Sequence, residues 1–202
     1  MHVQIINLLL YHQLRLCITE GYVIAALSIP SMGELLITGG AGFIGSSLAR
    51  KSIEKGWNVR IYDTVANGED QTLTQLQNDG VELIIGDIRN RKKLSEAISG
   101  CDAVVHLAAQ VSVSHSISNP HTTMDVNVNG TAQVLDLCLM NKVERVVVAS
   151  SAAVYGTAET LPLREDDAGL TLSPYAESKW INEKQIIDAR QKGLNAAALR
   201  FF

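Results

Sequence analysis

The stretch Thr38-Gly39-Gly40-Ala41-Gly42-Phe43-Ile44-Gly45 decides the fold of this chain. Its glycines match two overlapping patterns, which start at Gly39 and Gly40 and both end at Gly45. The stretch follows the apolar, strand-like residues 35–37 and opens an amphipathic, helix-like segment. Between a strand and a helix, such a turn lets backbone amides approach a pyrophosphate at the positive end of the helix, whereas without that context it is often only a turn. This order predicts a dinucleotide-binding turn.

Short apolar runs alternate with helix-length segments from residue 33 onward. Continuous apolar runs such as the one at 146–149 indicate strands that are buried on both faces. The pattern predicts strands at 34–38, 57–63, 81–86, 102–107, 143–150 and 194–200, and helices at 43–55, 69–79, 91–99, 121–141 and 174–192. Alternation of this kind predicts an α/β fold with a Rossmann-type, doubly wound parallel sheet. The polar stretch 156–173 is too long for a simple connection and is a candidate wall of a substrate site.

Size, charge and cysteine content point to a globular protein with a small-molecule partner. The chain has 202 residues, 47% of them hydrophobic, and a net charge of -4 without a basic cluster. A chain with this charge pattern has no positively charged patch that would attract nucleic acid or an anionic membrane surface. The three cysteines, at 17, 101 and 138, lie far apart and form no metal-binding pattern, so we expect no metal site. A reducing, cytoplasmic location is the default expectation.

The two ends of the chain differ from the rest. Residues 1–31 have no clear periodicity, and their apolar pieces are shorter than the roughly 20 residues that a bilayer span requires. A basic region typical of a secretory signal is also missing there. We therefore expect residues 1–31 to be a weakly structured extension, with the domain beginning at 33. At the other end the chain stops within a strand-like run, and we expect 33–202 to be a truncated domain.

Three further segments are predicted to lie at the carboxyl edge of the sheet, where ligands bind in folds of this type. Asp63 ends the second strand 18 residues after Gly45, close to the roughly 20 expected for an acid that binds the adenosine ribose. Its carboxylate would accept from a 2'-hydroxyl and repel a 2'-phosphate, which favours NAD over NADP; alternatively it is a turn or cap residue. Asp87 ends the third strand. His106, at the end of the fourth, is more typical of a hydrogen-bonded core residue than of a catalyst.

A second group of residues indicates acid-base chemistry. Tyr175 and Lys179 are four positions apart after Ser173-Pro174, a good start for a helix, and therefore share a helix face. We expect the ammonium to depress the tyrosine pKa by about 1 to 3 units, so that the phenol can act as general acid or base. Ser151 ends a strand, where its hydroxyl can bond the same substrate oxygen. The alternatives are a half-exposed aromatic beside a solvated lysine, and a turn serine.

Together these motifs resemble the extended short-chain dehydrogenase/reductase family, in its nucleotide-sugar epimerase/dehydratase branch. The resemblance covers about residues 33–202. It rests on the glycine turn, Gly-Asp-Ile at 86, His-Leu-Ala-Ala-Gln at 106, Asn-Val-Asn-Gly-Thr at 127, Ser-Ser-Ala-Ala-Val-Tyr-Gly at 150 and Ser-Pro-Tyr-Ala-Glu-Ser-Lys at 173.

The resemblance implies a role for each matching residue. Ser151, Tyr175 and Lys179 would form the catalytic set, and Tyr175 and Lys179 would also contact the cofactor, NAD. The remaining cofactor contacts would be Gly39, Gly42 and Gly45 in the turn, Phe43 and Ile44 under the pyrophosphate, Asp63 on the adenosine ribose, Asp87 and Ile88 around the adenine, and Leu107, Ala108, Ala109 and Gln110 beside the nicotinamide.

Within this branch, the residues after Ser151 distinguish the reactions. Dehydratases of the family carry an Asp-Glu pair there and decarboxylases a Glu, whereas this chain has Ala152 and Ala153. A 4-epimerase needs no second acid or base. In that reaction Tyr175 takes the 4-hydroxyl proton while NAD takes the C4 hydride, and the keto-sugar then turns over and takes the hydride back on its other face. UDP-glucose, UDP-N-acetylglucosamine or a uronic-acid analogue would be substrates.

Two other functions stay open. One is a net dehydrogenase or reductase of the same superfamily, and the other is a non-catalytic NAD(H)-binding module. The resemblance also implies a smaller substrate-binding domain after Phe202 and a homodimer formed through the helices at about 121–141 and 174–192, although these helices could equally pack within one subunit. We expect little or no turnover from the 202-residue chain by itself.

Overall fold

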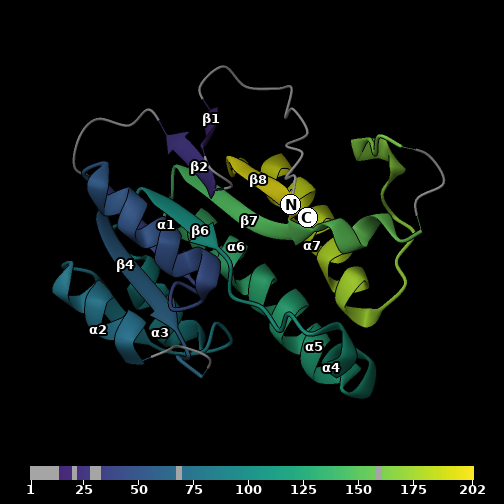
Figure 1. The fold of residues 1–202 in the computed structure, drawn as a ribbon, viewed down its shortest axis with the longest axis horizontal. Helices are drawn as coiled ribbons and strands as arrows, with labels where there is room; N and C mark the ends of the chain where they lie inside the picture. The colour runs from purple at the N-terminus through teal and green to yellow at the C-terminus, as the bar shows by residue number, and fades with distance from the viewer. Residues whose placement is uncertain (1–13, 20–21, 28–32, 67–69, 158–160) are drawn as a thin grey trace.

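A computed structural model describes residues 14–19, 22–27, 33–66, 70–157 and 161–202. Its centre is a six-stranded parallel sheet with the strand order β5-β4-β3-β6-β7-β8 (Figure 1). The strands are β3 (Glu34–Thr38), β4 (Asn58–Asp63), β5 (Glu82–Ile85), β6 (Ala103–His106), β7 (Arg145–Ser151) and β8 (Ala196–Phe201). The chain builds outward from β3 to β5 and then crosses back to β6 on the other side of β3. This reversal makes the β3–β6 boundary the topological switch point, where a ligand crevice forms in such folds. The predicted fold class is confirmed.

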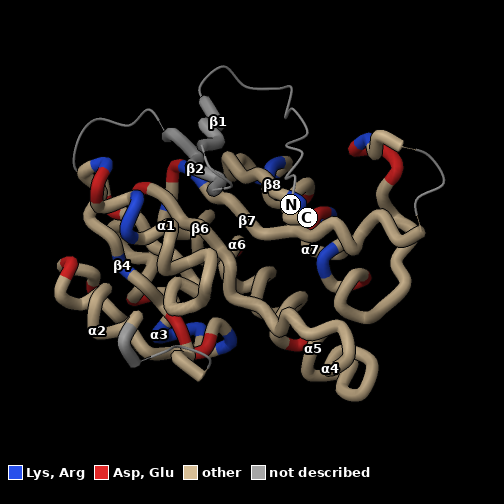
Figure 2. The backbone as a smooth tube through the Cα atoms, viewed as in Figure 1, with Lys and Arg blue, Asp and Glu red and all other residues tan. Residues whose placement is uncertain are grey.

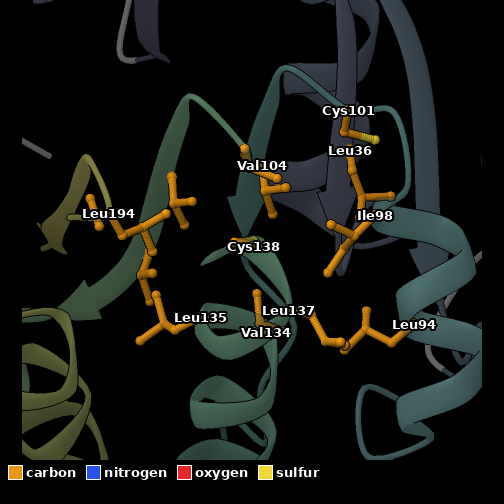
Figure 3. Close-up of a cluster of buried hydrophobic side chains, with 14 of the residues drawn as sticks. Leu36, Leu94, Ile98, Cys101, Val104, Val134, Leu135, Leu137, Cys138 and Leu194 are labelled. Carbon is orange, nitrogen blue, oxygen red and sulfur yellow. The ribbon is translucent and has the colours of Figure 1, made fainter. Parts of the chain in front are cut away.

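Helices cover both faces of the sheet. On one face, Leu35, Ile37 and Val105 pack with α1 (Phe43–Glu54) and α2 (Asp70–Asn78). On the other, the alternating residues Leu36 and Val104 pack with α3 (Arg91–Ile98), α6 (Gly130–Met140) and α7 (Pro174–Gln191), as Figure 3 shows for α3 and α6. Burial on both faces explains why the strands are continuous apolar runs rather than alternating ones.

The predicted helix at 121–141 is not one regular helix. It consists of α5 (Pro120–Met124), a π-helical segment η1 (Asp125–Asn129) and α6. The buried Asn127 of η1 bonds the backbone of Gln110 on the neighbouring loop, and this long-range contact coincides with the widened turn. A shorter helix that the sequence pattern did not predict, α4 (Val113–Ser118), precedes it and is capped by Ser112.

The remaining elements lie outside this framework or connect it. Two short 3-10 helices, η2 (Ala152–Tyr155) and η3 (Glu165–Asp167), lie between β7 and α7. Within the predicted extension, β1 (Leu14–Thr19) and β2 (Tyr22–Leu27) pair antiparallel as a separate two-stranded sheet, and the rest of 1–31 except these strands lies outside the described residues. In the described part of the chain, no helix combines the length and apolar character needed to cross a bilayer.

Candidate functional site

A cleft of about 970 Å³ runs along the carboxyl edge of the sheet. Every residue predicted for the site lines it, so one cavity brings together segments from β3 to α7. These residues are Gly39, Gly42, Phe43, Ile44, Gly45, Asp63, Asp87, Ile88, Leu107, Ala108, Ala109, Gln110, Ser151, Tyr175 and Lys179.

The glycine turn packs too closely for side chains at two of its positions. Gly39 has φ +71°, and a Cβ there would lie 2.6 Å from the backbone nitrogen of Ala108. A Cβ at Gly45 would overlap the Gly39 carbonyl oxygen. At Gly42, by contrast, a Cβ would make only an ordinary van der Waals contact. Gly42 is the N-cap of α1, and because it has no side chain, no side-chain hydrogen bond occupies the backbone N–H groups of the first turn. Phe43, in that turn, is 85% exposed. The turn therefore offers backbone donors in an open, positively polarised position.

Asp63 ties the glycine turn to the loop after β4. Its Oδ2 accepts the N–H of Ala41 at 3.0 Å, and its Oδ1 accepts the N–H of Val65 at 2.8 Å. Val65 has φ 55°, a conformation that is unusual for a β-branched residue. The carboxylate thus has a structural role that spacing alone did not reveal, in addition to its position in the cleft.

At the edge-strand end of the cleft, Asp87 is held by an arginine. Arg89 donates to the Asp87 carboxylate at 2.6 Å and to Asp125 at 2.7 Å. The hydrogen bonds from Arg89 lower the pKa of Asp87. Asp87 is therefore an anion throughout the neutral range, although the exposure of the pair limits its contribution to stability.

Ser151, Tyr175 and Lys179 lie together at the ends of β7 and α7. Ser151 shares a side-chain hydrogen bond with Tyr175, and its Oγ also accepts the N–H of Ala153 at 3.1 Å. The Nζ of Lys179 lies 5.9 Å from the centre of the Tyr175 ring and donates to the carbonyl of Ala149 at 2.9 Å. The predicted helix start is present, because Ser173 Oγ accepts the N–H of Ala176 and Pro174 is the first residue of α7.

The expected depression of the tyrosine pKa is wrong for this structure. Burial raises the pKa of Tyr175, and the hydrogen bond with Ser151 offsets this only in part. Burial likewise lowers the pKa of Lys179 to about 8. The four-residue spacing correctly predicted that Tyr175 and Lys179 lie on one face of the helix. However, the Lys179 amine donates to the Ala149 carbonyl, and loss of water around the phenol outweighs the effect expected of the ammonium.

His106 is a core residue, as predicted. It is 2% exposed, with Nδ1 2.6 Å from Thr38 Oγ1 and Nε2 2.9 Å from Thr131 Oγ1. Burial, and secondarily the charge of Lys179, lower its pKa to about 3. The imidazole is therefore neutral and hydrogen-bonded on both sides, and it does not line the cleft.

Two supports of the site were missed by sequence reasoning. Asn127 accepts the Gln110 N–H at 2.7 Å and donates to the Gln110 carbonyl at 3.0 Å and to Ser178, which donates to the Tyr175 carbonyl. It therefore joins the loop after β6 to the first turn of α7. The sequence signal for this support is the motif Asn-Val-Asn-Gly-Thr at 127, which indicates the family but not the contact with Gln110.

The second support is a largely buried ion pair between Glu183 of α7 and Arg200 of β8. Glu183 also accepts from Ser150, the neighbour of Ser151, while Arg200 also donates to Tyr155 and to the Glu165 carbonyl. The pair holds the catalytic helix, the end of β7 and the following loop in one network. In sequence, these residues are an ordinary acid and an ordinary base.

The wall of the cleft after β6 is uncharged. From β6 to the end of α5, residues 103–124 include no Asp, Glu, Lys or Arg. Figure 2 shows α4 without red or blue, whereas acidic and basic residues are interspersed over much of the rest of the described chain. In the described part of the chain, no three His, Cys, Asp or Glu side chains form a cluster suited to a metal ion. The arrangement is suited to holding a dinucleotide along the sheet edge and to proton transfer at Tyr175.

Comparison with known proteins agrees with this architecture. A relative from Methanocaldococcus jannaschii is 39% identical over 171 residues, which are 83% of this chain and 54% of the relative. The crystal structure of UDP-glucose 4-epimerase from Brucella ovis in complex with NAD has a TM-score of 0.76 and 32% identity, covering 82% of this chain and 50% of that one. UDP-N-acetylglucosamine 4-epimerase from Methanobrevibacter ruminantium, solved with UDP-N-acetylmuramic acid, has a TM-score of 0.78 and 30% identity, with coverages of 84% and 55%.

The chain spans about half the length of these relatives. A family model, described as the NAD dependent epimerase/dehydratase family, matches residues 35–202. The matched range includes the glycine turn, Asp63 and the Ser151–Tyr175–Lys179 cluster, and therefore the whole cleft. This chain belongs to the NAD dependent epimerase/dehydratase family.

Proposed function

We propose that this chain binds NAD along the cleft and supplies the cofactor-binding and acid-base half of a nucleotide-sugar 4-epimerase. The observation that carries the proposal is that one cleft is lined by the glycine turn, by Asp63 and by the Ser151, Tyr175 and Lys179 cluster. A pure binding module has no need of this last cluster. The names of the relatives, which are UDP-sugar 4-epimerases, support the same reaction class.

The residues present fit NAD. The turn has no room for side chains at Gly39 and Gly45, so backbone N–H groups, and not side chains, would face the pyrophosphate. Asp63 supplies an acceptor for a ribose hydroxyl, Asp87 and Ile88 border the adenine position, and Leu107 to Gln110 form an uncharged wall for the nicotinamide. When bound, NAD supplies reversible two-electron oxidation of a substrate carbon.

The chain's own residues would handle the proton. As the phenolate, Tyr175 would accept the proton of a sugar hydroxyl, and Ser151 would hold the same sugar oxygen through its own hydroxyl. Lys179, which is positively charged below pH of about 8, stabilises negative charge that develops on the Tyr175 oxygen and is available to a nicotinamide ribose. Because the pKa of Tyr175 is raised, the phenol is protonated at neutral pH before substrate binds, and it must release this proton to solvent before it can accept the proton of the sugar hydroxyl.

The reaction is proposed to be 4-epimerisation because the segment after Ser151 carries no acid. Ala152 and Ala153 begin η2, where an acid-base pair for water elimination would stand. The substrates proposed are UDP-hexoses such as UDP-glucose, UDP-N-acetylglucosamine or a uronic-acid analogue. A net dehydrogenase is the second candidate, since Ser151, Tyr175 and Lys179 would serve it equally.

We also propose a homodimer and a cytoplasmic location. Apolar side chains are exposed on the two helices predicted to pair, namely Met140 on α6 and Ile187 on α7. Burial of such side chains between two copies would be favourable. Light scattering of the purified chain at increasing concentration measures the assembly, and a monomer at all concentrations would contradict it.

A chimera tests the reaction. Residues 33–202 replace the matching half of the Brucella ovis enzyme, and the product sugar and free NADH are assayed with UDP-glucose. Interconversion of C4 epimers without NADH release supports the proposal, and its loss in the Tyr175→Phe chimera, which should still bind NAD, locates the chemistry. Net sugar oxidation with NADH release would favour the dehydrogenase instead. A wild-type chain that is well folded but takes up no NAD would refute the cofactor site.

A further inference from the structure

The peptide segment that follows β5 is held in place from the protein interior. Gly86, Asp87 and Ile88 line the end of the cleft beside the outermost strand, whereas Tyr175 and Ser151 stand beside β7. Under the proposed function, this is the end of the cleft that receives the adenine. Backbone contacts alone give the segment two hydrogen bonds, from Gly86 N–H to the Asp63 carbonyl and from Asn90 N–H to the Asp87 carbonyl, both 2.8 Å long.

Tyr62 supplies the first side-chain support. It lies in β4, it is fully buried, and its hydroxyl donates to the Asp87 carbonyl at 2.9 Å. Burial raises the pKa of this phenol, so it keeps its proton and acts as a donor. A Cβ at Gly86 would lie 2.5 Å from Cζ of Tyr62, which shows that the glycine is what allows the phenol to reach past the strand end.

Gln133 supplies the second support from a different element. It lies in the first two turns of α6, and its Nε2 donates to the Ile88 carbonyl at 2.6 Å. Gly130, one turn earlier, makes room for the same residue, because a Cβ there would lie 2.5 Å from Cδ1 of Ile88. Two successive carbonyl groups are therefore held by neutral donors from β4 and α6.

Fixing a carbonyl fixes its whole peptide group. Because the peptide unit is planar, the bond from Tyr62 to the Asp87 carbonyl also sets the direction of the Ile88 N–H, and the bond from Gln133 to the Ile88 carbonyl sets that of the Arg89 N–H. The Asp87 side chain is oriented in turn, since Arg89 binds its carboxylate both through Nη2 and through its own N–H, at 2.9 Å. Tyr62 and Gln133 thus fix the orientation of the Ile88 N–H, the Arg89 N–H and, through Arg89, the Asp87 carboxylate.

We infer that Tyr62 and Gln133 are positioning residues for the adenine half of the dinucleotide, a role that rests on the proposed NAD site. Tyr62 also lines the cleft, but its hydroxyl, like the side-chain amide of Gln133, is bonded to a backbone carbonyl and acts on the ligand through the Asp87–Ile88 peptide. They preorganise this segment, so that binding does not have to order it.

Fragment binding to the purified chain tests the inference. Tyr62→Phe, Gln133→Leu and the double variant are compared with wild type for affinity towards NAD, AMP and nicotinamide mononucleotide, by calorimetry or ligand-detected NMR. Each variant should bind AMP and NAD about 2- to 10-fold more weakly, the usual effect of one neutral hydrogen bond, and should bind nicotinamide mononucleotide as wild type does. Gln77→Leu, which changes an exposed glutamine of α2 outside the cleft in the same way as Gln133→Leu, is the matched control and should leave all three affinities unchanged.

The outcomes separate the two proposals. Unchanged AMP affinity in the double variant, or equal weakening of both fragments, would overturn the positioning role while NAD binding by wild type still supports the site. Failure of folded wild type to bind NAD would overturn the site itself, and the inference with it. If Tyr62→Phe does not fold, as its thermal unfolding will show, Gln133→Leu decides alone, because Gln133 is only partly buried.

Discussion

Replacing Asp63 by Asn tests whether this carboxylate is a structural anchor as well as a ligand for ribose. The simple expectation for removing this acid is that NADP binding improves, because the charge that repels a 2'-phosphate is gone. In this structure both carboxylate oxygens already accept backbone N–H groups, from Ala41 at 3.0 Å and from Val65 at 2.8 Å. Asparagine has one side-chain oxygen, so its amide group must face one of these donors.

The loss can be scaled from these contacts. A hydrogen bond to a charged group contributes about 1.5 to 3 kcal/mol, which corresponds to a factor of about 10 to 150 in an equilibrium constant. If that energy holds the glycine turn in its binding geometry, Asp63→Asn should weaken NAD by this factor, and NADP should gain little because it needs the same turn.

Calorimetric titration of wild type and Asp63→Asn with NAD and NADP measures both affinities, and thermal unfolding reports the loosened turn. Asp79→Asn, an exposed acid outside the cleft, controls for the change in net charge. An Asp63→Asn protein that binds NADP as tightly as wild type binds NAD, with unchanged stability, would refute the anchoring argument.

Three other predictions concern stability and NAD binding. Burial lowers the pKa of Lys179 from 10.5 to about 8. Between these two pH values the unfolded chain holds a proton that the folded chain has lost, so the free energy of unfolding rises with pH. In urea titrations, this free energy should rise by about 3 kcal/mol in wild type relative to Lys179→Met over that interval. Glu183→Gln should destabilise the protein by about 3 to 5 kcal/mol because it leaves the Arg200 charge buried and unpaired, and addition of Arg200→Met should recover part of this loss in the same assay. Gly39→Ala should abolish calorimetric NAD binding, whereas Gly56→Ala, at a similar φ but with open space around its Cβ, should cost only about 1 to 2 kcal/mol and leave NAD affinity intact.

The features that sequence predicted well depend on local pattern. Continuous apolar runs such as 146–149 identified the strands because a parallel sheet buries both faces. The glycine turn was predictable because positive φ and close backbone approach at Gly39 demand that residue. Ser151, Tyr175 and Lys179 were placed together by strand-end position and helical spacing.

What sequence did not predict depends on contacts between distant segments. The π-helical segment forms where Asn127 reaches the backbone of Gln110, and no local preference specifies that bond. The pKa of Tyr175 depends on burial and on where the Lys179 amine points, which spacing along a helix does not determine. The Glu183–Arg200 pair joins residues whose partnership exists only after β8 has docked beside β7.

The reversal of strand order between β3 and β6 separates the proposed cofactor contacts and the acid-base groups into two consecutive segments of the chain, which meet where Gln133 of α6 holds the Ile88 carbonyl. Contacts proposed for adenosine come from the segment before residue 90, on β3, β4 and β5, and the acid-base groups come from the segment after residue 103, on β7 and α7. Substitutions before residue 90 should therefore change cofactor preference, and substitutions after residue 103 should change the type of reaction. Recombination at the connection between them, after α3, would yield hybrids that inherit each property from a different parent, provided that the second parent supplies the Gln133 donor to the Ile88 carbonyl.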